Sequence, residues 1–148
     1  MIKIEKVCKI EDLERCTTVD GVVAFLYEHL DRWRDEPSAI GKAIAYAFSE
    51  EAGKGGYLLL AYEDKQLVGV VIMNKTGMEE YVPEYLLVYI AVHKNMRGRG
   101  IGKQLLRKVF AESKGNIALH VEYDNPAKHL YEKLGFTSKY AEMRWRKE

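Results

Sequence analysis

The sequence has little of what several classes of protein require. With only two cysteines, Cys8 and Cys16, it provides neither a disulfide framework nor a cysteine-rich zinc site. Its 23 Lys and Arg residues nearly balance 22 Asp and Glu residues, and the net charge of +1 argues against a general nucleic-acid binder and against attraction to membrane surfaces. A run of about 18 or more apolar residues is also missing, so we expect no membrane-spanning helix.

Low-complexity tracts, internal repeats and long linkers are absent too, and there are only three prolines. We therefore expect residues 1–148 to form a single domain, large enough to bury a core. The hydrophobic fraction of 47% and the charged fraction of 30% are ordinary for a globular protein. Residues 1–15 carry charges throughout and lack the apolar segment of a signal peptide. We expect a cytoplasmic, reduced protein in which both cysteines are structural.

What the sequence does contain is a regular succession of strand and helix patterns. Asp20 is a candidate N-cap, and Pro37 suits the first turn of a second helix. The polar residues 63–66 separate two short apolar runs and predict a hairpin. The expected strands are 2–7, 57–62, 67–74, 84–93, 116–122 and 140–146, and the expected helices are 20–34, 37–51, 100–113 and 126–134. The inward-facing stripes of the first two helices would be Val22, Leu26, Leu30 and Trp33, and Ile40, Ile44 and Ala47 or Phe48.

The most informative stretch follows the 84–93 strand and reads Arg97-Gly98-Arg99-Gly100-Ile101-Gly102. Alternate glycines let the backbone turn tightly and expose N–H groups. At a helix start, these amides and the positive end of the helix dipole face the same point, which predicts a cradle for a phosphate or pyrophosphate. Lys103 stands where a dinucleotide-binding fingerprint has its third glycine, and the Lys-Ser/Thr of a Walker loop is absent. The alternative is a glycine-rich helix entry with solvated arginines.

A second motif lies downstream, in Asp124-Asn125-Pro126-Ala127-Lys128-His129-Leu130-Tyr131-Glu132-Lys133-Leu134-Gly135-Phe136. The Arg-x-x-Gly-x-Gly stretch and this Asn, Ala, Leu-Tyr-Glu-Lys-Leu-Gly-Phe pattern together resemble the two hallmarks of the GNAT superfamily of N-acetyltransferases. They also stand in that family's order. The resemblance covers residues 57–137, whereas the first 55 residues follow only the general plan.

The resemblance implies an α/β fold (an α+β mixed sheet), with a central mixed β-sheet flanked by helices. Its two parallel strands, 84–93 and 116–122, would splay apart. It also implies acetyl-CoA as the acyl-donor cosubstrate, with the pantetheine arm in the gap and one strand amide polarising the thioester carbonyl. The implied cofactor-binding residues are the backbone of Ile90, Ala91 and Val92, the loop Arg97, Gly98, Arg99, Gly100, Ile101, Gly102 and Lys103, and the side chain of Asn125.

Tyr131 occupies the position at which the family carries its general acid. A phenol with a pKa near 10 is protonated at neutral pH and can donate a proton to a departing thiolate. The alternative is a tyrosine packed against the sheet. The interval from Asn125 to Tyr131 is one residue shorter than is usual in the family, so either Asn125 keeps its role or Asp124 takes it. We favour Asn125, whose expected role is hydrogen bonding to the cofactor arm.

Two residues are candidates for the general base. His120 lies in the expected second parallel strand, where some protein-acetylating relatives carry a glutamate, and an imidazole can accept a proton near neutral pH. Glu84 begins the first parallel strand and could act through water. The alternatives are a partly buried strand histidine and a solvated strand end. The other histidines, His29, His93 and His129, show no metal-ligand spacing, so we expect no metal.

The sequence therefore predicts an enzyme that transfers acetyl from acetyl-CoA to a primary amine by direct attack in a ternary complex. No Cys or Ser nucleophile falls in the expected site, which disfavours a covalent intermediate. The rival functions are a non-catalytic acyl-CoA sensor and a transferase of a longer acyl group. The acceptor, a small molecule or a peptide amine, would lie near residues 76–81, whose Glu79 and Glu80 could attract a cation or form a solvated loop. Neither nucleic acid nor a membrane is expected as a partner, and a homodimer is left open.

Overall fold

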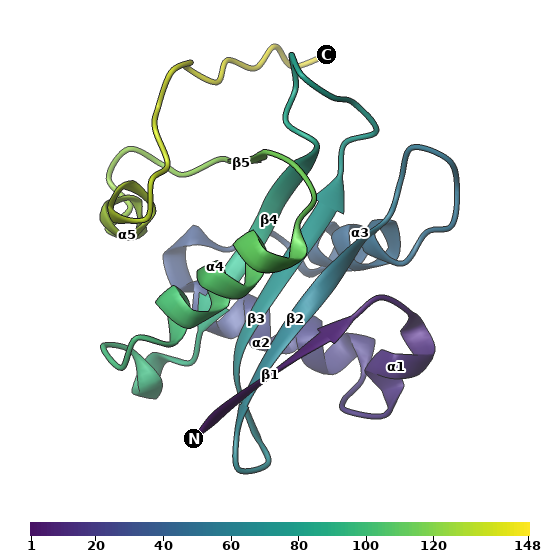
Figure 1. Cartoon of the computed structure of the whole chain (residues 1–148), viewed down its shortest axis with the longest axis vertical. Helices are drawn as coiled ribbons and strands as arrows, with labels where there is room; N and C mark the ends of the chain where they lie inside the picture. The colour runs from purple at the N-terminus through teal and green to yellow at the C-terminus, as the bar shows by residue number, and fades with distance from the viewer.

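Five strands form one mixed sheet in the order β1-β2-β3-β4-β5 in the computed structural model, which describes residues 1–148 (Figure 1). The first four strands are antiparallel to their neighbours, and β5 runs parallel to β4. This confirms the expected mixed sheet and its parallel pair. The strands are β1 (Ile2–Val7), β2 (Gly56–Glu63), β3 (Gln66–Lys75), β4 (Tyr85–Val92) and β5 (Ile117–Leu119).

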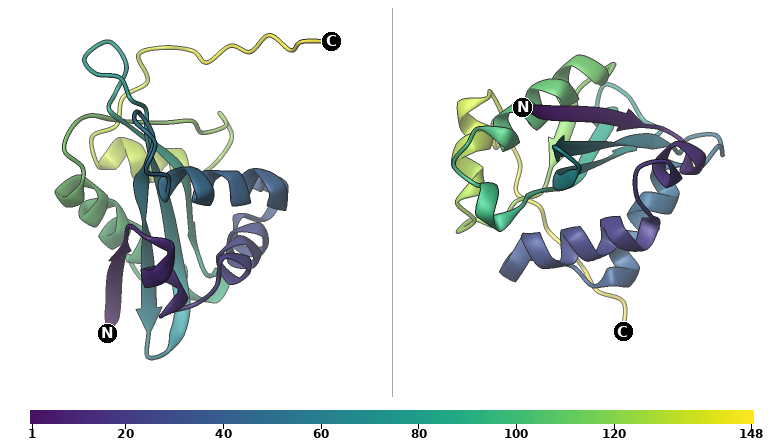
Figure 2. Two further views of the ribbon diagram at one scale, coloured as in Figure 1. Left: turned by 90° about the vertical axis from the view of Figure 1, so that its right-hand side faces the viewer. Right: turned by 90° about the horizontal axis from the view of Figure 1, so that it is seen from below.

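Helices cover both faces of the sheet, with α2 and α3 on one face and α4 and α5 on the other (Figure 2). The helices are α1 (Ile10–Glu14), α2 (Val19–Leu30), α3 (Pro37–Ala47), α4 (Ile101–Glu112) and α5 (Ala127–Lys133), with short 3₁₀ turns η1 (Asp31–Trp33) and η2 (Lys94–Met96). None of them combines the length and the apolar character that crossing a membrane requires.

The core lies in two layers because strand side chains alternate between the faces of the sheet. In β2, Leu58 and Leu60 point toward α2 and α3, whereas Tyr57 and Leu59 point toward α4. All four are buried. Burial on both faces explains why β2 and β3 read as continuous apolar runs rather than as alternating patterns.

The N-terminal third departs from the sequence prediction in its boundaries. Thr18, not Asp20, caps α2, because its Oγ1 accepts a hydrogen bond from the amide of Gly21 at 2.9 Å. The helix ends at Leu30, where Asp31 adopts a positive φ of 59°. α1 was not predicted, because its single turn is too short to show a helical period. α3 ends at Ala47 rather than at residue 51.

The C-terminal segment is not the predicted strand. Residues 137–148 are exposed and have no regular structure, and Cys8 and Cys16, expected to be structural, are exposed as well. β5 is also shorter than predicted, since it ends at Leu119 rather than near residue 122. A further strand needs a neighbouring edge with free backbone groups, and a three-residue edge strand provides few of them. The alternating pattern of residues 140–146 therefore finds no partner within the chain.

Candidate functional site

The sheet opens between β4 and β5. These strands pair only where Tyr85, Leu86 and Leu87 face residues 117–119, and β5 then leaves the sheet. On its other side, β4 has a bulge, because β3 pairs with Leu87 and then with Tyr89, so that Val88 has no partner. The predicted splaying of the two parallel strands is thus observed, and it leaves one side of β4 without a neighbour after Leu87.

Strand alternation determines which backbone groups face this opening. The amide of His93 donates to the carbonyl of Val68 on β3 at 2.8 Å. Two residues earlier, Ala91 therefore also directs its backbone groups toward β3, and Ile90 and Val92 direct theirs toward the opening. Of the three residues expected to hold the cofactor arm, Ile90 and Val92 thus direct their backbone groups toward the opening, whereas Ala91 directs its groups toward β3.

A glycine cradle lies at the C-terminal end of β4, where α4 begins. Gly98 and Gly100 have positive φ values of 81° and 79°, and a Cβ added to either would meet nothing within 4 Å. Gly100 is the N-cap of α4, and no side chain caps the helix, so its first amides are free. The side chain of Ile101 is buried under the sheet, and a Cβ on Gly102 would lie 3.4 Å from Leu130 of α5. The space beside Gly98 and Gly100 is therefore open, and free amides of this kind can bind an anion.

The two arginines of the cradle are engaged with other parts of the chain. Arg97 donates from Nε to the carbonyl of Val92 at 3.3 Å and from its terminal nitrogen to the carbonyl of His29. Arg99 forms a two-pronged pair with the carboxylate of Glu63 on β2, with one contact at 3.0 Å. Lys103 is exposed and unpaired. The free charge at the cradle therefore comes from Lys103 and the helix amides, while both arginines hold the loop in place.

Tyr131 projects from α5 into the layer between the sheet and α4. Its side chain is 8% exposed and packs edge-on against Phe136, with ring centroids 5.8 Å apart. The hydroxyl makes no hydrogen bond to the protein, yet its oxygen is not completely shielded from solvent. Burial raises the pKa of Tyr131 to about 12. The phenol is therefore protonated at neutral pH and free to donate to a ligand.

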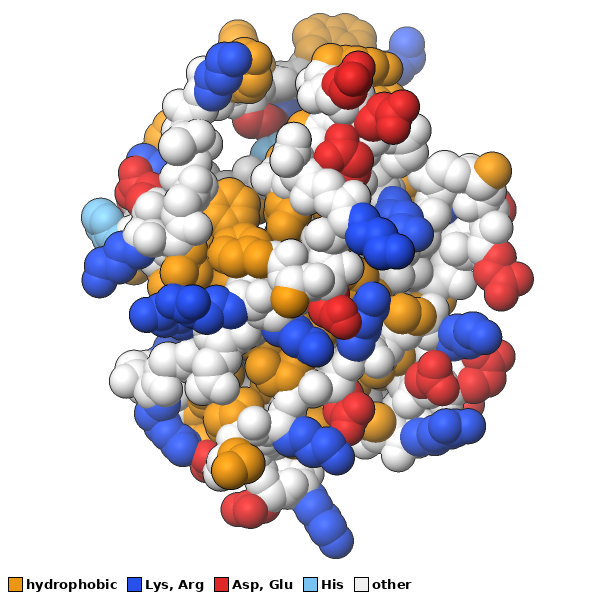
Figure 3. Space-filling model, in the orientation of Figure 1, with side chains coloured by type: hydrophobic (Ala, Val, Ile, Leu, Met, Phe, Trp, Pro, Cys, Tyr) orange, Lys and Arg blue, Asp and Glu red, His pale blue; other side chains and the backbone are white.

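The space-filling view shows the molecule hollowed between α4 and α5, with hydrophobic side chains at the bottom of the hollow (Figure 3).

Asn125 lies just before α5, where its Oδ1 accepts a hydrogen bond from the backbone amide of Ala127 at 2.9 Å. This Asx turn leaves the side-chain Nδ2 of Asn125 free to donate. Asp124, the alternative to Asn125, instead forms an ion pair with Arg32 at 3.1 Å.

The two candidate bases occupy different surroundings. His120 follows the last residue of β5 and is exposed, so it lies beside the opening but not in a paired strand as expected. The carboxylate of Glu84 accepts hydrogen bonds from the amides of Asn116, at 2.7 Å, and Glu80, at 3.0 Å. These bonds lower the pKa of Glu84. The carboxylate therefore connects the segments that contain Glu80 and Asn116, and its lowered pKa makes it a weak proton acceptor.

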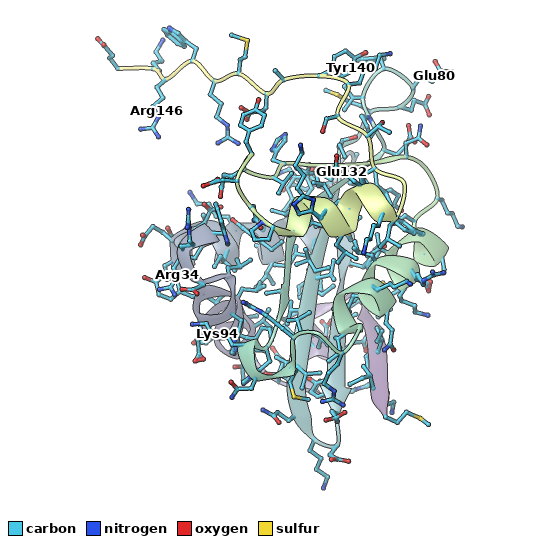
Figure 4. All side chains as sticks on the ribbon, turned by 90° about the vertical axis from the view of Figure 1, so that its left-hand side faces the viewer. Arg34, Glu80, Lys94, Glu132, Tyr140 and Arg146 are labelled. Atoms are coloured by element: carbon cyan, nitrogen blue, oxygen red, sulfur yellow. The ribbon has the colours of Figure 1, made fainter.

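Residues 76–84 lie at the opposite end of the molecule from the cradle. Figure 4 shows Glu80 far from Lys94, which follows β4 on the cradle side. Glu79 and Glu80 are both exposed.

Two surface cavities, of about 410 and 360 Å³, also lie away from the cradle. Lys75 lines both cavities, and Glu84 lines the second. No three His, Cys, Asp or Glu side chains gather as they would around a metal ion.

Sequence reasoning missed a histidine pair that supports the cradle. His29 of α2 is buried, and its Nδ1 accepts the amide of Lys94 at 3.1 Å. His93 accepts the amide of Asn95 at 3.1 Å and stacks on His29. Because the pair spans more than 60 residues of sequence, no local pattern could have indicated it.

The sequence of the chain resembles those of known acetyltransferases. A family model described as "Acetyltransferase (GNAT) domain" matches residues 54–138. The 5-NmdU N-acetyltransferase of Pseudomonas phage PaMx11 is 29% identical over 91 residues, which are 60% of this chain and 63% of that relative. The match thus spans less than two thirds of the phage protein's length.

Solved structures at lower identity share the fold. The aminoglycoside N-acetyltransferase AAC(6')-Iy, in complex with CoA, has a TM-score of 0.70 at 16% identity, over 99% of this chain and 95% of its own. The ribosomal-protein-alanine N-acetyltransferase from Brucella melitensis biovar Abortus 2308 has a TM-score of 0.67 at 18% identity, over 99% of each chain. An aminoglycoside acetyltransferase from an uncultured soil metagenomic sample, in complex with sisomicin, has a TM-score of 0.65 at 18% identity, over 99% of this chain and 95% of its own.

Proposed function

Because the chain belongs to the GNAT family of acetyltransferases, we propose that it transfers acetyl from acetyl-CoA to a primary amine by direct attack in a ternary complex. One arrangement supports this most strongly. The unpaired side of β4 runs from the bulge at Val88 to the glycine cradle, with the free hydroxyl of Tyr131 on the same face of the sheet as α4. An elongated ligand with phosphates at one end and a thioester at the other fits this order of features: a cradle, then an open strand, then a proton donor.

The backbone holds the acyl donor in this proposal. The first amides of α4 and those of Gly98 and Gly100 bind the pyrophosphate, with Lys103 adding charge. The open backbone groups of Ile90 and the amide of Val92 pair with the pantetheine arm as a neighbouring strand would, while the carbonyl of Val92 accepts from Arg97. One of these amides polarises the thioester carbonyl, where negative charge develops as the amine attacks.

Proton transfer involves two side chains. Tyr131 donates its hydroxyl proton to the sulfur as the carbon–sulfur bond breaks, and its pKa of about 12 keeps it protonated until that moment. His120 takes a proton from the acceptor amine, since it lies beside the opening and makes no hydrogen bond that would occupy its ring nitrogens. Glu84 is the weaker candidate, because its carboxylate already accepts two backbone amides.

The position of the cysteines supports direct attack rather than a covalent enzyme intermediate. Cys8 follows β1, at the opposite edge of the sheet from the opening, and Cys16 follows α1. Neither thiol lies at the open strand. Two rival functions keep the same fold: a sensor that binds acyl-CoA without turnover, and a transferase of a longer acyl group. The free hydroxyl of Tyr131 favours turnover over the sensor.

The test is release of free thiol from acetyl-CoA in the presence of a panel of amines. The panel includes sisomicin and 5-NmdU, which the names of the related proteins suggest, together with spermidine and a peptide with a free amino terminus. Thiol release that requires an amine and yields its acetylated product supports the proposal. Binding of acetyl-CoA without turnover on any acceptor would support the sensor, and a preference for propionyl- or butyryl-CoA would support the longer acyl group.

A further inference from the structure

The two faces of the sheet give the acyl donor and the acceptor opposite sides of the opening. α4, whose first turn forms the cradle, packs on the same face as Tyr131. A donor held by the cradle therefore enters from that face, and its leaving sulfur stays there with the phenol. The amine must then approach from the other face, on which α2 and α3 lie. This reasoning rests on the proposed function.

One carboxylate faces β4 from that second side. Tyr89 lies next to Ile90, but its side chain packs with α2 and α3. Its hydroxyl donates to Oδ2 of Asp35, in the segment between α2 and α3, at 2.5 Å. Burial first, and this hydrogen bond second, raise the pKa of Tyr89 far above its usual value, so the phenol remains a donor. Tyr89 thus holds Asp35 over the part of β4 that borders the opening.

The cations around Asp35 have other partners. Arg32 pairs with Asp124 at 3.1 Å, and Arg34 donates to the backbone carbonyl of Asp31 at 2.7 Å and lies over the ring of Tyr27. Lys94 lies 3.9 Å from the carboxylate of Asp31. Arg144, in the C-terminal segment, pairs with Glu142. Asp35 has no direct cationic partner and only one neutral hydrogen-bond donor.

The charge of Asp35 also acts on Arg144 of the C-terminal segment. The pKa of Arg144 is raised mainly by its hydrogen bond and ion pair with Glu142, and to a smaller extent by Asp35. The carboxylate is exposed, with one oxygen directed to Tyr89 and the other free. Such a group binds an ammonium through a charge-assisted hydrogen bond.

We propose that Asp35, positioned by Tyr89, binds a cationic group of the acceptor on the α2–α3 side of the opening. The chain therefore selects acceptors that carry a second ammonium besides the amine that is acetylated. The reacting amine must be neutral to attack, so the second, charged group is the one that Asp35 holds. Polyamines and aminoglycosides have this chemistry, whereas simple monoamines do not.

The experiment measures acceptor binding apart from turnover. Calorimetry follows sisomicin and spermidine binding to the protein saturated with CoA. Asp35→Asn should weaken both by about 10- to 100-fold, the loss of one charge-assisted hydrogen bond. It should leave the Kd of acetyl-CoA within about twofold, and in steady state the loss should appear in the acceptor KM rather than in kcat. A monoamine, benzylamine, should be unaffected.

Glu36→Gln is the matched control, since Glu36 is the next carboxylate along the chain, is exposed and forms no ion pair. It should leave sisomicin binding within about twofold. Tyr89→Phe should weaken binding less than Asp35→Asn, because the carboxylate remains but is no longer fixed. Equal losses in Asp35→Asn and Glu36→Gln would overturn the proposal, and so would a Tyr89→Phe loss as large as that of Asp35→Asn.

The failures of this inference and of the proposed function can be told apart. A wild-type protein that binds acetyl-CoA but neither sisomicin nor spermidine overturns the role of Asp35 and leaves acetyl transfer to other amines intact. A wild-type protein that does not bind acetyl-CoA overturns the proposed function, and the inference with it.

Discussion

His29 and His93 stack with ring centroids 4.1 Å apart and tie α2 to the loop that forms the glycine cradle. Each ring uses Nδ1 to accept a backbone amide, from Lys94 in one case and from Asn95 in the other. A protonated imidazole carries hydrogen on both nitrogens and cannot accept. The hydrogen bond from the Lys94 amide therefore requires the ring of His29 to be neutral.

The first prediction is that stability and cofactor binding fall together in mild acid. Burial, and then the charge of His93, lower the pKa of His29 below its ordinary 6.5, while Glu28 opposes this and Lys94 and Arg97 add to it. Since the unfolded chain binds the proton more readily, the stabilisation is complete above about pH 6.5 and decreases as the pH falls below that value. Thermal melts between pH 7.5 and 5.5 should show a falling Tm, with each ~1 kcal/mol lost corresponding to about 3 °C.

The variant that tests this is His29→Asn, whose side-chain oxygen can accept the amide of Lys94 but does not titrate. The decline of Tm and of acetyl-CoA affinity with acid should become shallower. His129→Asn is the control, because His129 is exposed on α5 and should leave the pH profile unchanged. A profile that stays equally steep in His29→Asn contradicts the role of the pair.

A second prediction concerns Gly100→Val, which should abolish acetyl-CoA binding while leaving a folded domain. The new side chain would project into the space of the cradle, and its backbone would keep a φ of 79° that costs a β-branched residue about 1–2 kcal/mol. Gly41→Val is the matched control, since a Cβ on Gly41 of α3 also meets nothing within 4 Å but lies far along the chain from the cradle. Calorimetry with acetyl-CoA checks both, and unchanged affinity in Gly100→Val would contradict the assignment of the loop.

Tyr131→Phe gives the third prediction, a fall in kcat of about 100-fold with little change in cofactor affinity. Stability should hardly change, because the hydroxyl has no protein partner to lose. With a pKa of about 12, Tyr131 should produce no falling limb in the rate below about pH 10. Equal losses in kcat and affinity would point to packing instead.

Tyr57→Phe is the control for Tyr131→Phe. Tyr57 lies on the same face of the sheet and also has a pKa raised to about 12 by burial. Its hydroxyl bonds to the carbonyl of Val109 and the hydroxyl of Ser113. The variant should therefore lose about 1 kcal/mol of stability and keep its kcat.

The fourth prediction separates the two candidate bases. If His120 accepts the amine proton, kcat/KM should rise with pH, and His120→Ala should remove this rise. Glu84→Gln should instead lower stability, because one oxygen that accepts an amide is lost, and leave the pH profile in place. If the rise follows the ionisation of each acceptor in both variants, neither residue is the base.

Glu84 also predicts how stability responds to acid. Its folded-state pKa is lowered by the amides of Asn116 and Glu80, so its contribution is present above its ordinary pKa of 4.5 and is lost as the pH falls below it. The pH dependence of unfolding below 4.5 should be shallower in Glu84→Gln than in the wild type.

The sequence alone determined the parts of this protein that rest on local chemistry. Alternate glycines at a helix start indicate a cradle wherever they occur, because φ above zero and free first-turn amides are properties of a few neighbouring residues. The hairpin, the parallel crossover and the position of Tyr131 on α5 likewise follow from short-range patterns.

The tertiary structure decided where the backbone and side-chain groups point and what they contact. The backbone groups of Ala91 point toward β3 rather than toward the opening, because the bulge at Val88 sets which residues of β4 pair with β3. Arg97 and Arg99 are held by partners that lie far from them in the sequence. The histidine pair and the contact between Tyr89 and Asp35 join elements more than 50 residues apart. Such contacts depend on how the sheet brings α2 beside β4, and no local periodicity carries that information.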